Sequence, residues 1–269
     1  MLTCLSDFRV FTALFAVFAT MAHTATADTQ RGRTVAENLD MSYSGYGTSV
    51  ANGKMTLFVG GRKAVRSFRS LSLETKGAID EMSILVFSEP KDMRGVALLT
   101  HARTEPREDL QWLYIPAGSR TKRITSSNKS GRFVSSEFSF EDLARQDVDE
   151  FTYAWLRQES CPSVSLTCDV IEAYPKSRNS GYSKRVIWVD TKAHRAYQID
   201  YFNQSGVHEK RLELSTYERP MGVKWRPMKL DMRNLLNNRR TVLEWSQYKF
   251  SVPLQPAFFD SNRLAEAAQ

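Results

Sequence analysis

The chain has 269 residues, with 37 Lys and Arg against 30 Asp and Glu, which gives a formal net charge of +7. This length suits one β-rich domain as well as two small ones. The positive charge suits anionic partners, such as lipid headgroups or acidic proteins, but it equally serves ordinary solubility. No apolar segment is long enough to span a bilayer, which excludes a multi-span helical membrane protein.

The first residues carry the pattern of an export signal. Val10–Ala22 is nearly all apolar but too short for a membrane-spanning helix. Small residues follow at the spacing that signal peptidase needs, ending at Ala27. We therefore predict a cleaved signal peptide over residues 1–27, with the cut between Ala27 and Asp28. An N-terminal membrane anchor is the alternative.

Helix signals are scarce in the rest of the chain. Three short helices are predicted, at 34–41, at 141–146 with Ser139 as its cap, and from Asp260 or Ser261 as cap through Ala268. The predicted strands are 57–59, 64–74, 82–87, 95–101, 110–115, 151–156, 168–174, 184–190, 195–202, 210–218, 223–232 and 241–250. Turn residues separate them, and a spacing of roughly 8–12 residues is typical of an antiparallel sandwich or barrel. Without a repeat, low-complexity tract or linker, residues 28–269 are predicted to form one domain.

Two cysteines remain after removal of the signal, Cys161 and Cys168 in ESCPSVSLTCD. In an oxidising compartment, a pair this close around a proline predicts a disulfide that pins a short loop. A metal site would need more ligands, and His101, His194 and His208 show no ligand spacing with each other or with the cysteines. We expect neither a metal nor a cofactor.

Catalytic motifs do not assemble into a nucleophile, a base and an orienting group. A G-x-S-x-G motif is absent, and Gly45–Gly47 lacks the third glycine of a dinucleotide site. Glu137, Glu141 and Asp142 are candidate paired carboxylates. Acids at the start of a helix explain Glu141 and Asp142 equally well. A protein without enzymatic activity is favoured, and an exported hydrolase that uses Glu137 or Asp142 is an alternative.

The segment 112–143 combines aromatic and basic side chains. Trp112 and Tyr114 lie two residues apart, as do Phe138 and Phe140, so each pair shares a strand face. Such faces line either a packed core or a lipid pocket. A binder of single-stranded nucleic acid also interleaves aromatics with bases, but an exported protein rarely meets nucleic acid, so no such partner is expected.

The stretch WLYIPAGSRTKRITSSNKSGRFVSSEFSFEDL, residues 112–143, resembles the hallmark of the periplasmic outer-membrane lipoprotein-sorting family, relatives of the lipoprotein carrier LolA. That hallmark has a W-x-Y-x-P strand, an R-R-I strand and a G-S-D-F-S-Y-E-D-L turn into a helix. Further similar stretches are EPKDMRGVALL (89–99), CDVIEAYP (168–175), GYSKRVIWVD (181–190), KWRPMKLDMRN (224–234) and TVLEWSQYKFSVPLQPAFFDSNRL (241–264). Ser135, Glu137 and Phe140 depart from the pattern, which has Gly, Asp and Tyr there.

The resemblance implies a mainly β (α+β) fold of the LolA/LolB type. It is a strongly curved antiparallel sheet forming an incomplete barrel, with short helices covering the open side and an apolar cavity between. It also implies a periplasmic carrier of lipoprotein acyl chains or another lipid. Such proteins are often associated with an RND-type inner-membrane exporter, and an outer-membrane acceptor would receive the cargo. A periplasmic lipid or envelope-stress sensor acting through a protein partner is the alternative.

On this basis we predict seven ligand-binding residues. Trp112, Tyr114, Phe138 and Phe140 would surround an apolar interior. The basic residues at its edge, where they would orient an anionic headgroup, are Arg120, Lys122 and Arg123. The alternative is that the segment only holds the fold together.

Overall fold

The computed structural model describes the backbone of residues 15–268 and the side chains of residues 28–268. The whole predicted signal peptide, residues 1–27, therefore lies outside the described side chains. Within residues 15–268, no helix combines the length and the apolar character needed to cross a bilayer.

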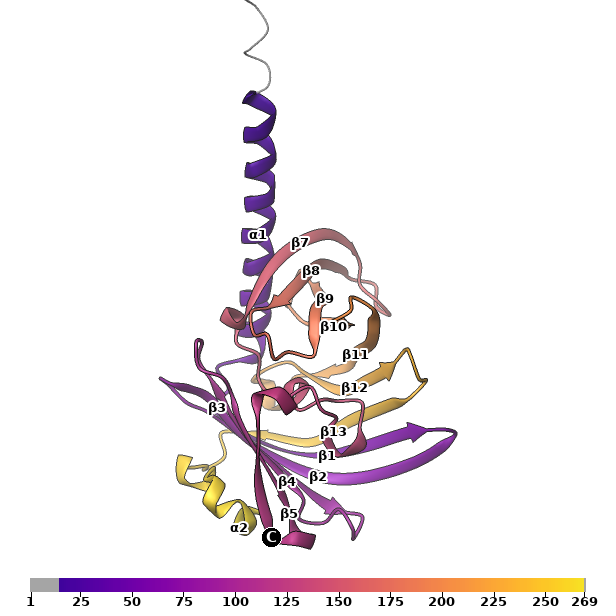
Figure 1. Ribbon diagram of the computed structural model, residues 1–269. Helices are drawn as coiled ribbons and strands as arrows, with labels where there is room; N and C mark the ends of the chain where they lie inside the picture. Colours follow the sequence, from indigo (N-terminus) through magenta and orange to yellow (C-terminus); the bar gives the residue numbers. More distant parts are fainter. Residues whose placement is uncertain (1–14, 269) are drawn as a thin grey trace, which may run out of the picture.

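One antiparallel sheet of thirteen strands dominates the fold, in the order β6-β5-β4-β3-β2-β1-β13-β12-β11-β10-β9-β8-β7 (Figure 1). Its strands are β1 Thr48–Val59, β2 Arg62–Glu74, β3 Ile79–Glu89, β4 Ala97–Arg103, β5 Leu110–Ile115, β6 Arg120–Ile124, β7 Phe151–Ser160, β8 Thr167–Pro175, β9 Tyr182–Asp190, β10 Ala196–Asn203, β11 His208–Glu218, β12 Arg226–Asn234 and β13 Arg240–Phe250. The two edge strands, β6 and β7, do not pair with each other, so the curved sheet is an incomplete barrel, as predicted.

Helices are few and lie beside the sheet. The long α1 spans Phe15–Tyr43, and the short α2 spans Leu264–Ala267. The 3-10 turns are η1 Pro116–Gly118, η2 Ser126–Asn128, η3 Phe133–Ser135, η4 Glu141–Leu143, η5 Val148–Glu150, η6 Pro220–Gly222, η7 Pro256–Phe258 and η8 Ser261–Arg263. Asp260 caps η8, because Asn262 N donates to its carboxylate. The helix predicted at 141–146 is only the turn η4, whose N-cap residue is Phe140, although Asp142 N donates to Ser139 Oγ.

The sheet buries both of its faces where it passes through β2, β3 and β4. Phe68 and Phe87 belong to the main core on the inner face. Leu71, Ile84 and Leu99 belong to a second core on the other face, where α2 contributes Leu264. Burial on both sides explains why MSILVF is a continuous apolar run instead of an alternating one.

The C-terminal half of α1 packs against β7, the last strand of the sheet (Figure 1). Gly32 makes this approach possible, because a Cβ there would lie 2.8 Å from the backbone carbon of Ala154 and from the backbone nitrogen of Trp155. Arg31 adds an ion pair to Asp169 at 3.0 Å and stacks over Trp155, 3.7 Å from the ring centroid. Helix α1 thereby lies beside the open edge of the sheet.

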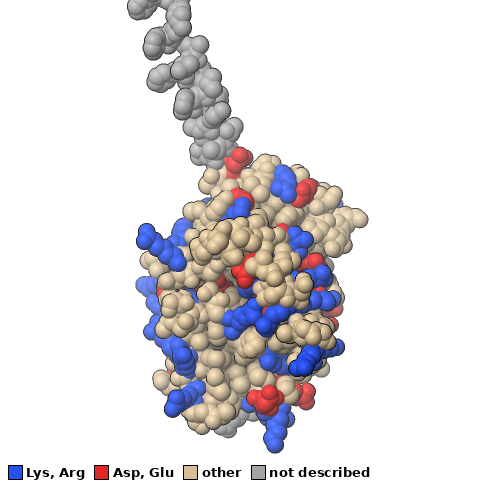
Figure 2. Space-filling view, turned by 45° about the vertical axis from the view of Figure 1, so that its right-hand side comes forward, with Lys and Arg blue, Asp and Glu red and all other residues tan. Residues whose placement is uncertain are grey.

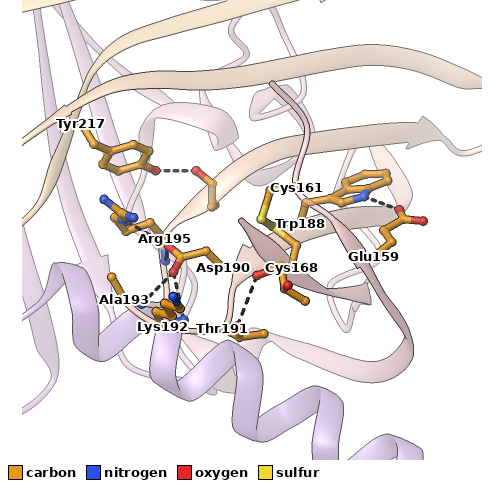
Figure 3. The surroundings of a disulfide bond; sticks show 12 residues. Glu159, Cys161, Cys168, Trp188, Asp190, Thr191, Lys192, Ala193, Arg195 and Tyr217 are labelled. Carbon is orange, nitrogen blue, oxygen red and sulfur yellow. Dashed lines mark hydrogen bonds and ion pairs between the residues drawn. A yellow bond between two sulfur atoms is a disulfide. The ribbon is translucent and has the colours of Figure 1, made fainter. Parts of the chain in front are cut away.

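The predicted disulfide joins Cys161 and Cys168, whose Cα atoms are 5.0 Å apart (Figure 3). Both cysteines are buried, and Trp188 and Tyr217 pack around them. The bond closes the loop between β7 and β8. Figure 2 shows Lys and Arg spread over much of the visible face, so surface charge alone does not locate a site.

Candidate functional site

A cavity of about 450 Å³ lies between the inner face of the sheet and α1. Its size falls within the range of roughly 300–1,000 Å³ that is usual for small-molecule sites. The side chains on its sheet side come from non-adjacent parts of the sequence and are mostly apolar. They include Phe151, Tyr153, Ala173, Ile187, Ala196, Ile199, Tyr201, Leu212 and Leu214.

Two elements cover the cavity. Ala36, Leu39 and Tyr43 face it from α1, and residues 142–148, which we name the lid segment, face it from the stretch between β6 and β7. The two covers are joined by Arg145, whose Nη2 donates to both carboxylate oxygens of Asp40 at 3.0 and 3.1 Å. Because both side chains are largely buried, this ion pair is less screened than one on the surface.

Charged groups lie inside this mainly apolar space. Arg226 donates to the carbonyl oxygens of Tyr43 and Trp225, at 2.9 and 3.1 Å. Glu81 accepts a hydrogen bond from the Tyr46 hydroxyl at 2.8 Å, and burial raises the pKa of this carboxyl. Arg185 of β9 also lines the cavity, with 6% of its surface exposed.

A second, smaller cavity of about 90 Å³ adjoins the first, and Arg185 and Phe151 line both. Two of the acids that line it, Asp109 and Glu150, are largely removed from solvent. Burial raises the pKa of Asp109 to about 6 and, with the neighbouring charge of Asp109, raises the pKa of Glu150 to about 8. At neutral pH, Glu150 is therefore mostly uncharged.

None of the seven residues predicted from the sequence lines the larger cavity. Trp112 and Tyr114 pack against the second core, beneath α2. Phe138 and Phe140 are buried in the main core, where the ring of Phe140 lies 5.7 Å from that of Phe133. The basic residues on the exposed edge strand β6 are Arg120, Lys122 and Arg123. The structure thus brings Phe138 and Phe140 together in one core and separates them from the other five; ligand contact by these residues stays a prediction.

The candidate carboxylates hold the lid segment and its neighbours in place. Glu137 pairs with Arg239 at 2.7 Å and with Arg132 at 3.4 Å. Glu141 accepts from Gly181 N at 2.9 Å and from Ser180 Oγ at 3.0 Å.

Asp142 is tied to two strands of the sheet. It accepts from the Tyr182 hydroxyl at 3.0 Å, and Lys210 Nζ lies 3.8 Å from its carboxylate. These contacts, together with those of Glu141, fasten the start of the lid segment to β9 and β11. Within the described residues, no group of three or more His, Cys, Asp or Glu is placed to hold a metal ion.

Arg185 lines the cavity but was not among the predicted site residues. Arg185, Ile187 and Val189 alternate on one face of β9, and all three are buried. A charged residue in register with inward-facing apolar positions is the signal that could have identified it.

The chain is similar to a known protein family. A family model described as "-like: Uncharacterized protein" matches residues 80–266. No curated protein matches the chain significantly.

Similar folds occur among solved structures. One is a domain from Vibrio parahaemolyticus described as an outer membrane lipoprotein-sorting protein domain, which is 32% identical, with a TM-score of 0.84 over 88% of this chain and 99% of that one. A DUF1329 family protein from Desulfovibrio piger is 28% identical, with a TM-score of 0.83 and the same coverage of both chains.

A LolA superfamily protein from Nitrosomonas europaea shares the fold, with 22% identity and a TM-score of 0.68 over 85% of this chain and 97% of that one. With the extent of the family match and the 32% identity to the Vibrio domain, the sequence resemblance is confirmed. The chain therefore belongs to the family of outer-membrane lipoprotein-sorting-like proteins and has the LolA-type fold.

Proposed function

We propose that this protein is a periplasmic carrier without enzymatic activity. It binds a lipophilic ligand, either lipoprotein acyl chains or another lipid, non-covalently and moves it toward the outer membrane. The observation that carries this proposal is the cavity of about 450 Å³, with apolar walls and a cover formed by α1 and the lid segment. Its relative from Vibrio parahaemolyticus, described as a lipoprotein-sorting domain, supports the same function.

Burial of hydrocarbon explains how such a site would hold its cargo. Each buried methylene contributes roughly 0.8 kcal/mol, so a dozen would supply on the order of 10 kcal/mol before the costs of ordering the ligand and the cover. A carrier must also release its cargo. Walls made of side chains such as Ile199, Leu212 and Leu214 suit this requirement, because dispersion contacts are individually weak and need no fixed partner.

Partners follow from the sequence resemblance. We include in the proposal an RND-type inner-membrane exporter as the donor and an outer-membrane acceptor as the recipient. Export by the predicted signal peptide would place residues 28–269 between them.

Native mass spectrometry of the protein purified from the periplasm tests the function. We expect one lipid per chain, released on denaturation and identifiable by extraction. The same spectrum reports the N-terminus, which should be Asp28. A native mass equal to that of the polypeptide alone, together with no uptake of added lipid, would remove the carrier proposal.

A further inference from the structure

Arg185 has an unusual environment for a buried charge. Its guanidinium lies between the two cavities, with 94% of the residue's surface removed from solvent, since 6% is exposed. Its Nε has no hydrogen-bond partner, and among the described residues no carboxylate lies within ion-pair distance of it. A guanidinium carries five N–H donors, so this group is left with unused hydrogen-bonding capacity.

Aromatic rings stabilise the charge of Arg185, but they do not provide a partner for its Nε. Phe151, Tyr182 and Tyr201 surround the guanidinium, with ring centroids 5.1, 5.2 and 5.3 Å from its central carbon. Cation–π attraction offsets part of the cost of burial. It does not replace the in-plane hydrogen bonds that a guanidinium makes with a carboxylate or a phosphate.

The nearby acids leave the charge of Arg185 in place. Glu141 is already held by Ser180 and Gly181, and Asp142 by Tyr182 and Ser139. Burial lowers the pKa of Arg185, but the influence of Tyr201, Glu141 and Asp142 outweighs it, so the group stays protonated.

We propose that Arg185 binds the oxyanion headgroup of an amphiphile whose chain occupies the larger cavity. The headgroup is a carboxylate or a phosphate, either of which can accept two parallel N–H bonds from the guanidinium. The chain would lie along Ile187, Ile199 and Leu214, which line the cavity with Arg185. This inference rests on the proposed carrier function and narrows its ligand to anionic lipids, such as long-chain fatty acids.

The test compares cis-parinaric acid with its methyl ester, which has the same chain without the negative charge. Binding is followed by the fluorescence of the polyene at a pH where the free acid is ionised. We expect the wild-type protein to bind the acid roughly tenfold or more tightly than the ester, as a charge-assisted hydrogen bond predicts. Arg185→Gln should weaken binding of the acid to the level of the ester and change ester binding less than threefold. Arg62→Gln, at an exposed position of β2 away from the cavity, is the matched control and should keep the preference.

The other possible outcomes distinguish a wrong headgroup assignment from a wrong carrier function. Equal binding of acid and ester by the wild-type protein would overturn the headgroup assignment and leave the carrier proposal standing. Equal losses of both ligands in Arg185→Gln would overturn it too, because they indicate a role in shaping the cavity. If Arg185→Gln does not fold, as judged by circular dichroism, two other measurements test the headgroup assignment. They are the ratio of acid to ester affinity in the wild-type protein and the same ratio in Arg185→Lys. Displacement of the probe by acetate or inorganic phosphate alone would contradict an amphiphile site, and binding of neither probe would refute the carrier function itself.

Discussion

Replacing Gly32 with alanine should displace α1 from β7 and loosen the cover of the cavity. The added Cβ would lie 2.8 Å from two backbone atoms, of Ala154 and Trp155, whereas ordinary contacts begin at 3.4 Å. Helix or strand must therefore move by roughly half an ångström, since backbone atoms cannot rotate away. Overpacking of this kind costs about 1–3 kcal/mol. Alanine gains back about 1 kcal/mol of helix propensity.

The shift also strains the contacts of Arg31 with Asp169 and Trp155, so we expect a net loss of about 1–2 kcal/mol in unfolding free energy. Equilibrium unfolding in urea measures this loss, and stopped-flow release of a bound fluorescent lipid should become faster. Gly118→Ala is the matched control, because its Cβ would meet only the side chain of Arg120 at 3.8 Å. If Gly32→Ala were more stable than the wild type, by the gain in helix propensity alone, the close packing of α1 on β7 would be refuted.

The disulfide and the buried Glu150 should each affect the stability of the protein. Reduction, or the pair Cys161→Ser and Cys168→Ser, should lower the unfolding free energy by roughly 2–3 kcal/mol, and an unchanged urea midpoint would contradict a role for the disulfide. Because the pKa of Glu150 is raised to about 8, its carboxyl group holds a proton more tightly in the folded state than in the unfolded state. The unfolding free energy should therefore fall as pH rises from about 5 to 8. In urea titrations, Glu150→Gln should reduce the pH dependence of the unfolding free energy and stabilise the protein at pH 8 by about 1 kcal/mol or more. If the pH dependence were equally steep in the variant, other titrating groups would be its cause.

Local sequence patterns were sufficient to predict most of the sheet. Each predicted strand coincides with an observed one, and the turns at 203–206 and 219–222 separate β10 from β11 and β11 from β12. The first part of β1 was missed because Asn52 and Gly53 have low strand propensity. The ring of Phe68, cross-strand from Gly53, occupies the space that a side chain at Gly53 would need, and so provides packing that local propensity cannot reveal.

The site was harder to predict than the fold. Alternation correctly placed Trp112 with Tyr114 on one face of β5, but it could not tell which core they enter. The predicted strand face for Phe138 and Phe140 is wrong, because both lie in the irregular stretch between η3 and η4. The cavity is lined by Ile199, Leu212 and similar residues, which look like ordinary core positions in the sequence. Whether such positions are packed or hollow depends on the summed volumes of side chains from distant strands, a helix and a loop.

The dependence of affinity on chain length tests the central claim most directly. A homologous series of saturated fatty acids, each displacing the same fluorescent lipid, gives the affinity per methylene. If the cavity of about 450 Å³ holds the chain, each methylene removed should weaken binding by up to roughly 0.8 kcal/mol, about fourfold, and short-chain acids should not compete. Affinity that does not change with chain length would show that the cavity does not bind the hydrocarbon, and would contradict the carrier function.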